Sequence, residues 1–236
     1  LIPLTFHEKI FIKIVYTISF NLGEKMEFIL VSFKNFKYAK TRLRNDLSDS
    51  LTEEIATKML ENVLTEVSKS MEADKKFLLT NDEKAIQMGT SKNLEIMRET
   101  KQINESSSID KACKILISKG AKGVLRIPAD LPLIESKDID RLILIGKSDK
   151  KSILVPSESQ TGTNAFYRTP PDVVDSCFGE NSLKKHINLL DKRKAKYEVI
   201  KMKSFETDID CIEDLIRIRS SNKKTRIIQY LKNINL

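Results

Sequence analysis

Glycine and tryptophan are the scarce residues of this sequence. Its 236 residues include seven glycines and no tryptophan, and aromatic residues make up 6%. Exposed aromatics are a common platform for single-stranded nucleic acids, so the composition argues against a nucleic-acid-binding protein. The cysteines, Cys113, Cys177 and Cys211, form no C-x-x-C pair, and only His7 and His186 could assist them. A structural zinc site is therefore not expected, and the scattered, odd count is typical of a reducing compartment such as the cytoplasm.

Basic residues outnumber acidic ones, 41 to 33, which gives a formal net charge of +8. A basic protein favours anionic partners: nucleic acid, an acidic membrane surface or a phosphorylated small molecule. The charge alone does not choose among them, and a solvated lysine-rich surface is the plain alternative. With 40% hydrophobic and 31% charged residues, the chain has the composition of a folded domain.

Residues 1–25 contain an apolar run, IFIKIVYTISFNL, that is short for a membrane span and carries Lys13. No small-residue cleavage site follows, as a secretory signal would require. Met26 then opens MEFILVSF, which predicts a buried first strand. We interpret residues 1–25 as an upstream extension of a protein that natively begins at Met26, with no membrane partner. The mass of the natural protein would test this expectation.

Apolar runs alternate with helical patterns along the rest of the chain. The helical period is clearest where Ile55, Met59, Val63 and Val67 recur every four residues. Ser50 or Thr52 is the expected N-cap of this helix. Strands are predicted at 27–33, 76–79, 93–97, 123–127, 153–155, 165–167 and 197–202, and helices at 52–68, 82–88, 109–118, 136–145, 182–190 and 211–219. This alternation predicts an α/β fold with a mainly parallel sheet, helices on both faces, and ligands bound beyond the carboxyl ends of the strands.

A basic loop follows the first predicted strand. Residues 34–48, KNFKYAKTRLRNDLS, hold Lys34, Lys37, Lys40, Arg42 and Arg44 but no glycine. Polyphosphate binding needs several converging cations, and arginine binds phosphate oxygens in a bidentate manner. The loop therefore favours phosphate binding through side chains, with a solvated basic loop as the equal alternative.

An acid follows a second apolar strand in RIPADLPLI, residues 126–134. Asp130 stands between two prolines, which hold the backbone extended and end the strand. A carboxylate placed rigidly at the end of a strand suits Mg²⁺, a hard cation that prefers oxygen ligands. The alternative is a helix N-cap, but Ser136 or Asp138 is better placed to cap the helix that follows.

Two short segments combine glycine with hydrogen-bond donors. In SESQTGTNAFYRTPP, Gly162 precedes Thr163, and in CFGENSLKKH, Gly179 precedes Ser182, which opens a predicted helix. Free N–H groups at a helix N-terminus bind carboxylate or phosphate, although an ordinary N-cap also explains Ser182. His186 lies four residues later on the same helix face, either as a substrate contact or, as we favour, as a packed histidine.

The acids of FETDIDCIEDLIRI, residues 205–218, fall into two pairs. Glu213 and Asp214 suit the first turn of a helix, where acids complement its dipole. That explanation does not cover Asp208 and Asp210, which point the same way if the segment is extended. A second pair of oxygen ligands is therefore available.

Together these segments resemble the 2-phospho-L-lactate guanylyltransferases, enzymes of deazaflavin coenzyme (F420) biosynthesis. AKTRLRNDLS, IPADLPLI, GTNAFYRTPP, FGENSLKKH and DIDCIEDL occur in the order and spacing of that family, over about residues 27–219. The GTNA and FG-x-x-S-x-x-x-H pieces are specific to it, whereas AKTRL and D-x-D-x-x-E-D-L are shared more widely. The resemblance implies one Rossmann-like, GT-A-like nucleotidyltransferase domain over residues 26–219, with a mixed, mainly parallel sheet. A basic tail, residues 220–236, follows, and its apolar spacing predicts a short amphipathic helix for packing or assembly.

The resemblance also implies a reaction: GMP passes from GTP to the phosphate of 2-phospho-L-lactate or phosphoenolpyruvate, pyrophosphate leaves, and Mg²⁺ is the cofactor. A cytoplasmic homodimer without a nucleic-acid partner is expected. The implied catalytic residues are Lys40, Asp130 and Asp210; the metal ligands are Asp130, Asp210 and Asp208; the nucleotide contacts are Lys34, Lys40, Arg42 and Asn104; and the acceptor contacts are Thr163, Gly179 and Ser182.

The sequence departs from the family in places. INESSSIDKACK is more polar than the small-residue run usual there, and Cys211 stands where threonine is usual. Three alternatives stay open: another sugar-phosphate or cofactor nucleotidyltransferase, a basic nucleic-acid-binding protein, and an inactive homologue that serves as a scaffold. The sequence does not choose among phospholactate, phosphoenolpyruvate and phosphoglycerate as acceptor.

Overall fold

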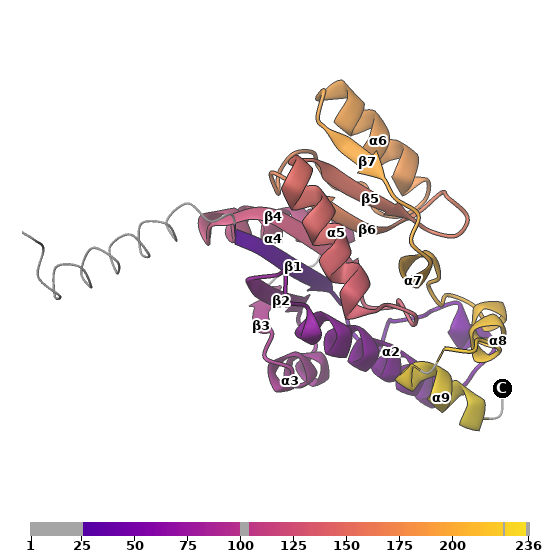
Figure 1. Cartoon of the computed structure of the whole chain (residues 1–236). Coiled ribbons are helices and arrows are strands. Elements are labelled where there is room, and N and C mark those ends of the chain that lie inside the picture. The colour runs from indigo at the N-terminus through magenta and orange to yellow at the C-terminus, as the bar shows by residue number, and fades with distance from the viewer. Residues whose placement is uncertain (1–25, 100–103, 224, 235–236) are drawn as a thin grey trace, which may run out of the picture.

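The computed structural model describes residues 26–99, 104–223 and 225–234, so the interpretation of residues 1–25 lies outside the described residues. Its first strand, β1 (Met26–Ser32), lies inside a seven-stranded sheet of order β3-β2-β1-β4-β6-β5-β7 (Figure 1). The apolar interior of β1 is buried, as expected for a strand covered on both faces.

The sheet is mixed and mainly parallel, as the sequence predicts. Its other strands are β2 (Lys75–Thr80), β3 (Glu95–Arg98), β4 (Ala121–Pro128), β5 (Ser152–Pro156), β6 (Thr163–Arg168) and β7 (Tyr197–Val199). β1 pairs in parallel with β2 and β4, β2 with β3, and β5 with β7, whereas β6 is antiparallel to both β4 and β5. Ser32 and Pro128 are register partners, so the loops after β1 and β4 leave the sheet side by side.

Helices cover both faces of this sheet (Figure 1). They are α2 (Asp49–Lys69), α3 (Glu83–Ser91), α4 (Glu105–Ser118), α5 (Ser136–Asp149), α6 (Ser182–Lys192), α7 (Lys203–Glu206), α8 (Ile212–Arg219) and α9 (Arg226–Asn233), with a 3₁₀ turn, η1 (Leu43–Asn45). Along β1, Ile29 and Val31 join the core beneath α2 and α5, while Phe28 and Leu30 join the core beneath α4. The alternation of a strand thus builds two apolar cores, one on each face.

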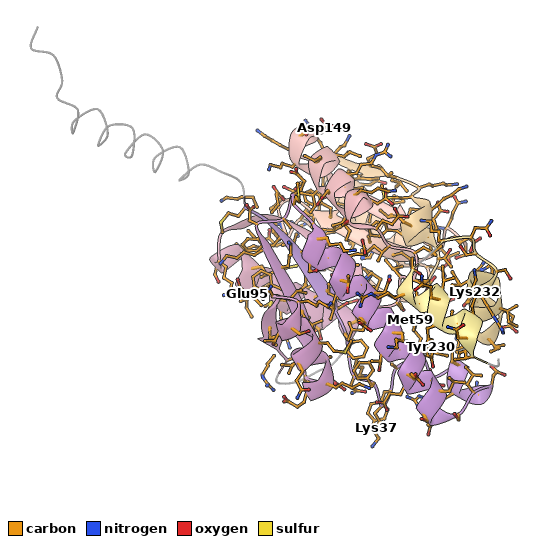
Figure 2. The ribbon with its side chains drawn as sticks, turned by 60° about the horizontal axis from the view of Figure 1, so that its bottom comes forward. Lys37, Met59, Glu95, Asp149, Tyr230 and Lys232 are labelled. Atoms are coloured by element: carbon orange, nitrogen blue, oxygen red, sulfur yellow. The ribbon has the colours of Figure 1, made fainter. Side chains whose placement is uncertain are left out.

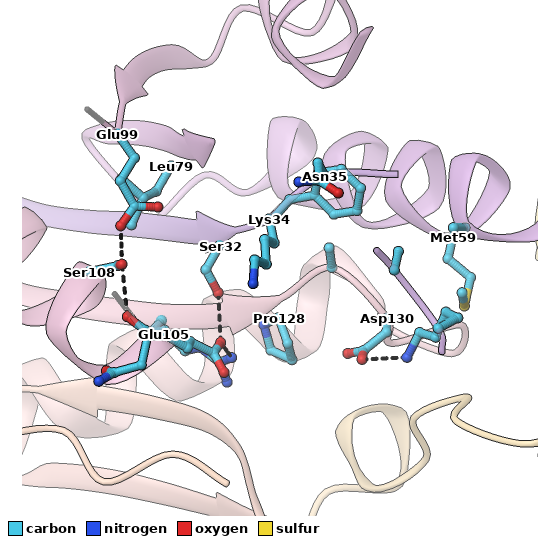
Figure 3. Close-up of a pocket in the computed structure, with 17 residues that line it drawn as sticks. Ser32, Lys34, Asn35, Met59, Leu79, Glu99, Glu105, Ser108, Pro128 and Asp130 are labelled. Atoms are coloured by element: carbon cyan, nitrogen blue, oxygen red, sulfur yellow. Dashed lines mark hydrogen bonds and ion pairs between the residues drawn. The ribbon is translucent and has the colours of Figure 1, made fainter. Parts of the chain in front are cut away.

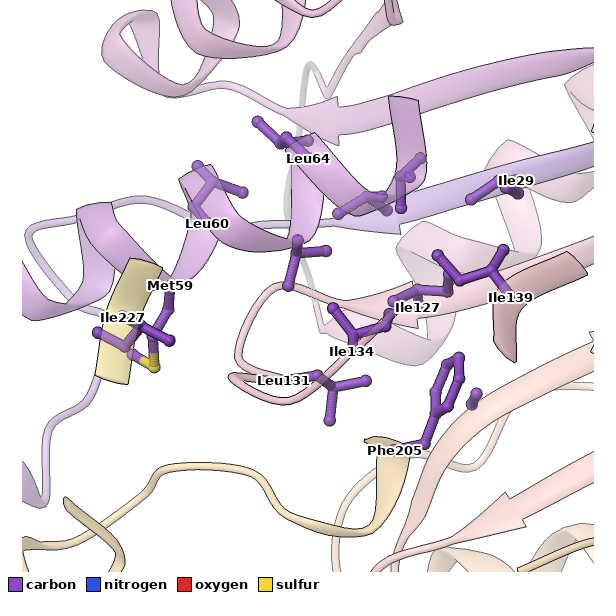
Figure 4. Close-up of a cluster of buried hydrophobic side chains, with 14 of the residues drawn as sticks. Ile29, Met59, Leu60, Leu64, Ile127, Leu131, Ile134, Ile139, Phe205 and Ile227 are labelled. Carbon is purple, nitrogen blue, oxygen red and sulfur yellow. The ribbon is translucent and has the colours of Figure 1, made fainter. Parts of the chain in front are cut away.

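The basic tail contributes to the first of these cores. Ile227, Ile228 and Leu231 of α9 are fully buried, and α9 packs against α2 and α8. Figures 2 and 4 show Tyr230 and Ile227 of this helix beside Met59 of α2. The amphipathic pattern of the tail therefore serves packing within the chain.

Several helix ends differ from the prediction. The N-cap of α2 is Ser48, whose hydroxyl accepts the N–H of Leu51, rather than Ser50 or Thr52. α5 runs through Gly146 to Asp149 instead of ending at the glycine. A Cβ at Gly146 would lie 2.2 Å from the Tyr167 ring, so this glycine provides close packing rather than a stop.

α4 begins at Glu105, four residues before the predicted start at Ile109, because Asn104 caps it by accepting the N–H of Ser107. The sequence pattern locates the buried face of α4 and misses its polar first turn. None of the helices in the described ranges combines the length and apolar character that crossing a membrane requires. All three cysteines are free thiols.

Candidate active site

Lys40 joins two acids from distant parts of the chain. Its Nζ donates to Asp130 Oδ2 at 2.7 Å and to Asp210 Oδ1 at 2.9 Å. The Lys40 side chain is 9% exposed, against 27% for Asp130 and 48% for Asp210. A buried ammonium is thus held between two carboxylates that face the solvent side of the cluster.

Local structure explains how these side chains converge. Asp130 follows β4 directly, and the N-cap of α5 is Glu135, so Asp130 is not a helix cap. Lys40 lies in the loop after β1 with φ of 54°, a left-handed conformation that costs energy for a residue with a side chain. Asp210 is positioned by Asp214, whose carboxylate accepts its backbone N–H.

The three charges stabilise one another. Burial lowers the pKa of Lys40, but the charges of Asp130 and Asp210 outweigh it and hold the pKa above its ordinary value. Burial raises the pKa of Asp130, but Lys40, and Arg126 further away, bring it below its usual range. Burial and the negative charges of Asp130 and Asp210 raise the pKa of Asp208. Asp208 therefore belongs to the same electrostatic cluster.

The donor set of this cluster fits a magnesium ion. Two carboxylates already converge on one cation, the Lys40 ammonium. Mg²⁺ typically takes one or two protein carboxylates and completes its shell with phosphate oxygens and water. Within the described ranges, no three or more His, Cys, Asp or Glu side chains form a ready-made metal centre. The arrangement fits an ion that is completed by a phosphorylated substrate.

A cavity of about 310 Å³ lies beside the cluster (Figure 3). Of the residues predicted from the sequence, Lys34, Lys40, Asn104 and Asp130 line it. Arg42 does not: it is exposed at the start of η1. The loops after β1 and β4 thus form a hollow at the carboxyl edge of the sheet.

Thr163, Ser182 and His186 form a second, fully buried group. The N–H of Thr163 donates to Ser182 Oγ at 2.9 Å, and Thr163 Oγ1 lies 3.1 Å from His186 Nδ1. His186 Nε2 accepts the N–H of Cys177 at 2.9 Å, so the ring proton is on Nδ1 and is donated to Thr163. The N-cap of α6 is Asn181, so Ser182 is the first residue of the helix rather than its cap.

His186 is a packed histidine, the interpretation that the sequence favours. It is fully buried, and its ring centroid lies 5.0 Å from those of Phe166 and Phe178. Burial, followed by the charges of Arg168 and Arg126, lowers the pKa of His186 to about 3. The ring is therefore neutral at pH 7 and bonds the Thr163 hydroxyl and the backbone N–H of Cys177.

This second group borders the cavity through Phe178. Its ring lies over the guanidinium of Arg126, 4.2 Å from ring centroid to Cζ, and Arg126 lines the cavity. Next to it, Gly179 has φ of 108°, and a Cβ there would meet no atom within 4 Å. Gly179 thus lies near the cavity and faces open space, whereas Ser182 is buried.

Sequence reasoning missed three charged residues of the cavity wall: Glu99, Glu105 and Arg126. Arg126 is 4% exposed on β4 and is paired with Glu105 at the start of α4. A charge inside an apolar strand requires a partner, and that requirement was the available signal. This signal does not reveal which acid, distant in the sequence, pairs with Arg126.

The family comparison bears on this geometry directly. The model of the family described as "Guanylyl transferase CofC like" matches residues 27–236. The chain belongs to this family. The match includes the Lys40, Asp130 and Asp210 loops, the Gly179 segment and the residues of α9.

CofC-like relatives carry three different names. A 2-phospho-L-lactate guanylyltransferase of Methanobrevibacter smithii is 28% identical over 88% of this chain and 90% of its own length. A phosphoenolpyruvate guanylyltransferase of Conexibacter woesei is 24% identical over 81% and 86%. A 3-phospho-D-glycerate guanylyltransferase of Colwellia psychrerythraea is 25% identical over 79% and 88%. The identities are too alike to select one acceptor.

Solved structures show the same fold as this CofC-like chain. A candidate nucleotide-diphospho-sugar transferase from Desulfovibrio desulfuricans superposes with a TM-score of 0.72 at 12% identity, covering 89% of this chain and 95% of that one. At this identity the likeness establishes the nucleotidyltransferase-type α/β fold, which the sequence pattern predicts.

Proposed function

We propose that this chain transfers the GMP group of GTP to the phosphate of 2-phospho-L-lactate or phosphoenolpyruvate, with release of pyrophosphate, in deazaflavin coenzyme (F420) biosynthesis. One observation supports it most: Lys40 and two acids from three separate loops converge beside a cavity of about 310 Å³. Membership of the CofC-like family supports guanylyl transfer as the reaction, and the cavity beside Lys40 is the candidate site for it.

In this reaction an ionised oxygen of the acceptor phosphate attacks the α-phosphorus of GTP. One P–O bond forms as the bond to the leaving pyrophosphate breaks. The attacking oxygen already carries charge, so no serine, cysteine or histidine nucleophile is needed. Both reactants are anions, and the protein contributes positioning and charge neutralisation.

The cluster residues have separate tasks in the proposal. Lys40 neutralises the phosphates that react. Lys34, which also lines the cavity, binds another part of the triphosphate. Asp130 and Asp210 are the residues that would hold magnesium, with Asp208 as a third candidate. Bound there, the ion neutralises charge on the transferred phosphoryl group.

Two further nucleotide contacts are assigned. Arg42 is exposed within the basic loop, from which it would reach the phosphate tail from outside the cavity. Asn104 uses its side-chain oxygen to cap α4 and keeps its NH₂ group for a contact with the nucleotide.

Thr163, Gly179 and Ser182 would bind the acceptor acid. Ser182 Oγ accepts the N–H of Thr163, and Thr163 Oγ1 accepts the ring N–H of His186. Each hydroxyl therefore keeps its own proton to donate to an anion. Gly179 leaves room for the acceptor to approach the backbone.

The test is pyrophosphate release with GTP and Mg²⁺, offering 2-phospho-L-lactate, phosphoenolpyruvate and 3-phosphoglycerate separately. ATP and CTP serve as nucleotide controls. Release that depends on GTP and on 2-phospho-L-lactate or phosphoenolpyruvate supports the proposal and identifies the acceptor. Release with 3-phosphoglycerate alone would support guanylyl transfer and contradict the proposed acceptor. Release with CTP and none with GTP would contradict it and favour a related nucleotidyltransferase. The homodimer and the cytoplasmic location stay predictions; light scattering of the purified protein tests the first.

A further inference from the structure

The cavity has two chemically different ends. Figure 3 shows Glu99 and Glu105 at one end and Asp130, paired with Lys40, at the other, with Lys34 between them. Lys40 and Lys34, with a magnesium ion held by Asp130 and Asp210 under the proposed function, would neutralise a polyphosphate at that end, whereas Arg126 at the other end is already paired with Glu105. A nucleotide in this cavity therefore places its phosphates at the lysine end and its base at the end with Glu99 and Glu105.

The two glutamates differ in how their charge is satisfied. Glu105 Oε1 is paired with Arg126 and also accepts the Ser32 hydroxyl at 3.1 Å. Glu99 accepts a hydrogen bond from the Ser108 hydroxyl, a neutral donor, and has no ion-pair partner in the part of the chain that the structure describes. The unneutralised charge at this end is thus on Glu99.

A buried donor without an acceptor lies at the same end of the cavity. Arg126 is 4% exposed and lines the cavity, and its Nε–H meets no acceptor among residues 26–99, 104–223 and 225–234. A buried N–H without an acceptor is costly unless a ligand supplies one. Leu79, 6% exposed on the same side, adds an apolar wall for a flat ring (Figure 3).

The charge pattern selects one base. A carboxylate is an acceptor with two oxygens, so it is satisfied best by two adjacent donors. Guanine presents such a pair, N1–H and its 2-amino group. Adenine and cytosine each present an amino group beside a ring nitrogen that accepts, and uracil presents one N–H between two carbonyls.

We propose that Glu99 is the guanine-reading residue of this chain, accepting N1–H and the 2-amino group in a bidentate pair. The inference rests on the proposed function and deepens it, since it assigns the choice of GTP to one side chain. A site built to bond an N–H rejects analogues that lack it, because its own polar group is then left unpaired.

Direct titration of the protein with nucleotides, without acceptor, tests the assignment. The probes are GTP, ATP, ITP, which lacks the 2-amino group, and XTP, which carries a carbonyl in its place. The variant is Glu99→Gln. Its amide oxygen accepts the N1–H of the base, and its NH₂ group donates towards the substituent at position 2. The matched control is Glu83→Gln: Glu83 is an exposed partner of Arg98 and does not line the cavity.

The wild type and Glu83→Gln should bind GTP at least tenfold more tightly than ITP. In Glu99→Gln, GTP affinity should fall about 10- to 100-fold, the preference over ITP should vanish, and XTP should become the best ligand. Ser108→Ala, which removes the donor to Glu99, should weaken GTP binding without creating a preference for XTP.

Other results overturn the inference. If Glu99→Gln still prefers GTP to ITP while the wild type binds GTP, another residue reads the base and the proposed function stands. An equal loss of affinity for all the nucleotides in Glu99→Gln would indicate that the Glu99 carboxylate contacts the ribose rather than the base. If the folded wild type shows no preference for GTP over ATP, the proposed guanylyl transfer fails together with the inference.

Discussion

The carboxylate of Asp214 accepts the backbone N–H of Asp210 at 2.9 Å. The same oxygen, Oδ2, accepts the N–H of Cys211 at 3.1 Å and lies 3.2 Å from its Sγ. One side chain in the first turn of α8 therefore fixes the backbone from which Asp210 reaches Lys40. Asp214 acts on the cluster through position and does not line the cavity.

Asp214→Asn should weaken this support without removing a cluster residue. We expect the Mg²⁺ concentration for half-maximal rate to rise about tenfold, as is typical when a residue behind a metal ligand is changed. Titration of the pyrophosphate-release rate with Mg²⁺ measures it. Glu213→Gln, in the same turn but exposed, is the control. An unchanged dependence of the rate on Mg²⁺ in Asp214→Asn would argue against Asp210 as a metal ligand.

Asp130→Ala should abolish turnover and leave the protein folded. The change removes one of two carboxylates at Lys40 but leaves the ammonium paired with Asp210. Loss of one such electrostatic partner costs on the order of a hundredfold or more in rate. Rates are compared with thermal unfolding of the same samples, and Asp149→Ala, an exposed pair partner of Lys151, is the control. Normal turnover would remove the metal assignment.

Gly179→Ala tests the acceptor segment through the backbone. No atom is within 4 Å of the new Cβ, so the effect comes from φ of 108°, which costs an L residue about 1–2 kcal/mol. We expect a higher KM for the acceptor acid and an unchanged KM for GTP. Gly120→Ala carries a similar strain, at φ of 96°, between α4 and the amino end of β4. Equal KM values in the two variants would argue against an acceptor site at Gly179.

His186 should make stability depend on pH on the acid side. Its pKa in the folded protein is about 3, against an ordinary value of 6.5. The unfolded chain therefore takes up the proton first, and stability that is complete above about pH 6.5 is lost as the pH falls towards 3. Between pH 7 and pH 5 the loss should be about 2 kcal/mol.

His186→Gln keeps an acceptor for the Cys177 N–H and removes the titration. Urea unfolding at the two pH values should show a lower stability at pH 7 and a smaller fall to pH 5 than in the wild type. The same fall in both proteins would mean that another group titrates.

The strands and the mainly parallel character of the sheet were predictable because local signals agree with them, whereas the strand order was not predicted. Alternating apolar runs and helical periods gave every strand of the observed sheet, and prolines around Asp130 marked the end of β4. Helix ends were less predictable: Ser48 rather than Ser50 caps α2, since neighbouring polar residues compete for the role.

The site was predictable in part. Lys34, Lys40, Asn104 and Asp130 were selected from the sequence and line one cavity. The left-handed backbone at Lys40 was not, since it is imposed by the surrounding loop. Nor was the end that holds Glu99, because Glu99, which follows β3, meets side chains of α4 and β4 there only once the sheet has formed.

The Lys40 ammonium gives the acidic cluster a counter-ion of its own. Asp130 and Asp210 are held together by a covalently tethered cation before any substrate arrives. A chain with this design does not need a metal to keep its carboxylates from repelling each other, so chelation should leave its melting temperature unchanged. Under the magnesium assignment, Asp130 and Asp210 would hold the ion for charge neutralisation in the reaction, and the fold itself would not depend on it.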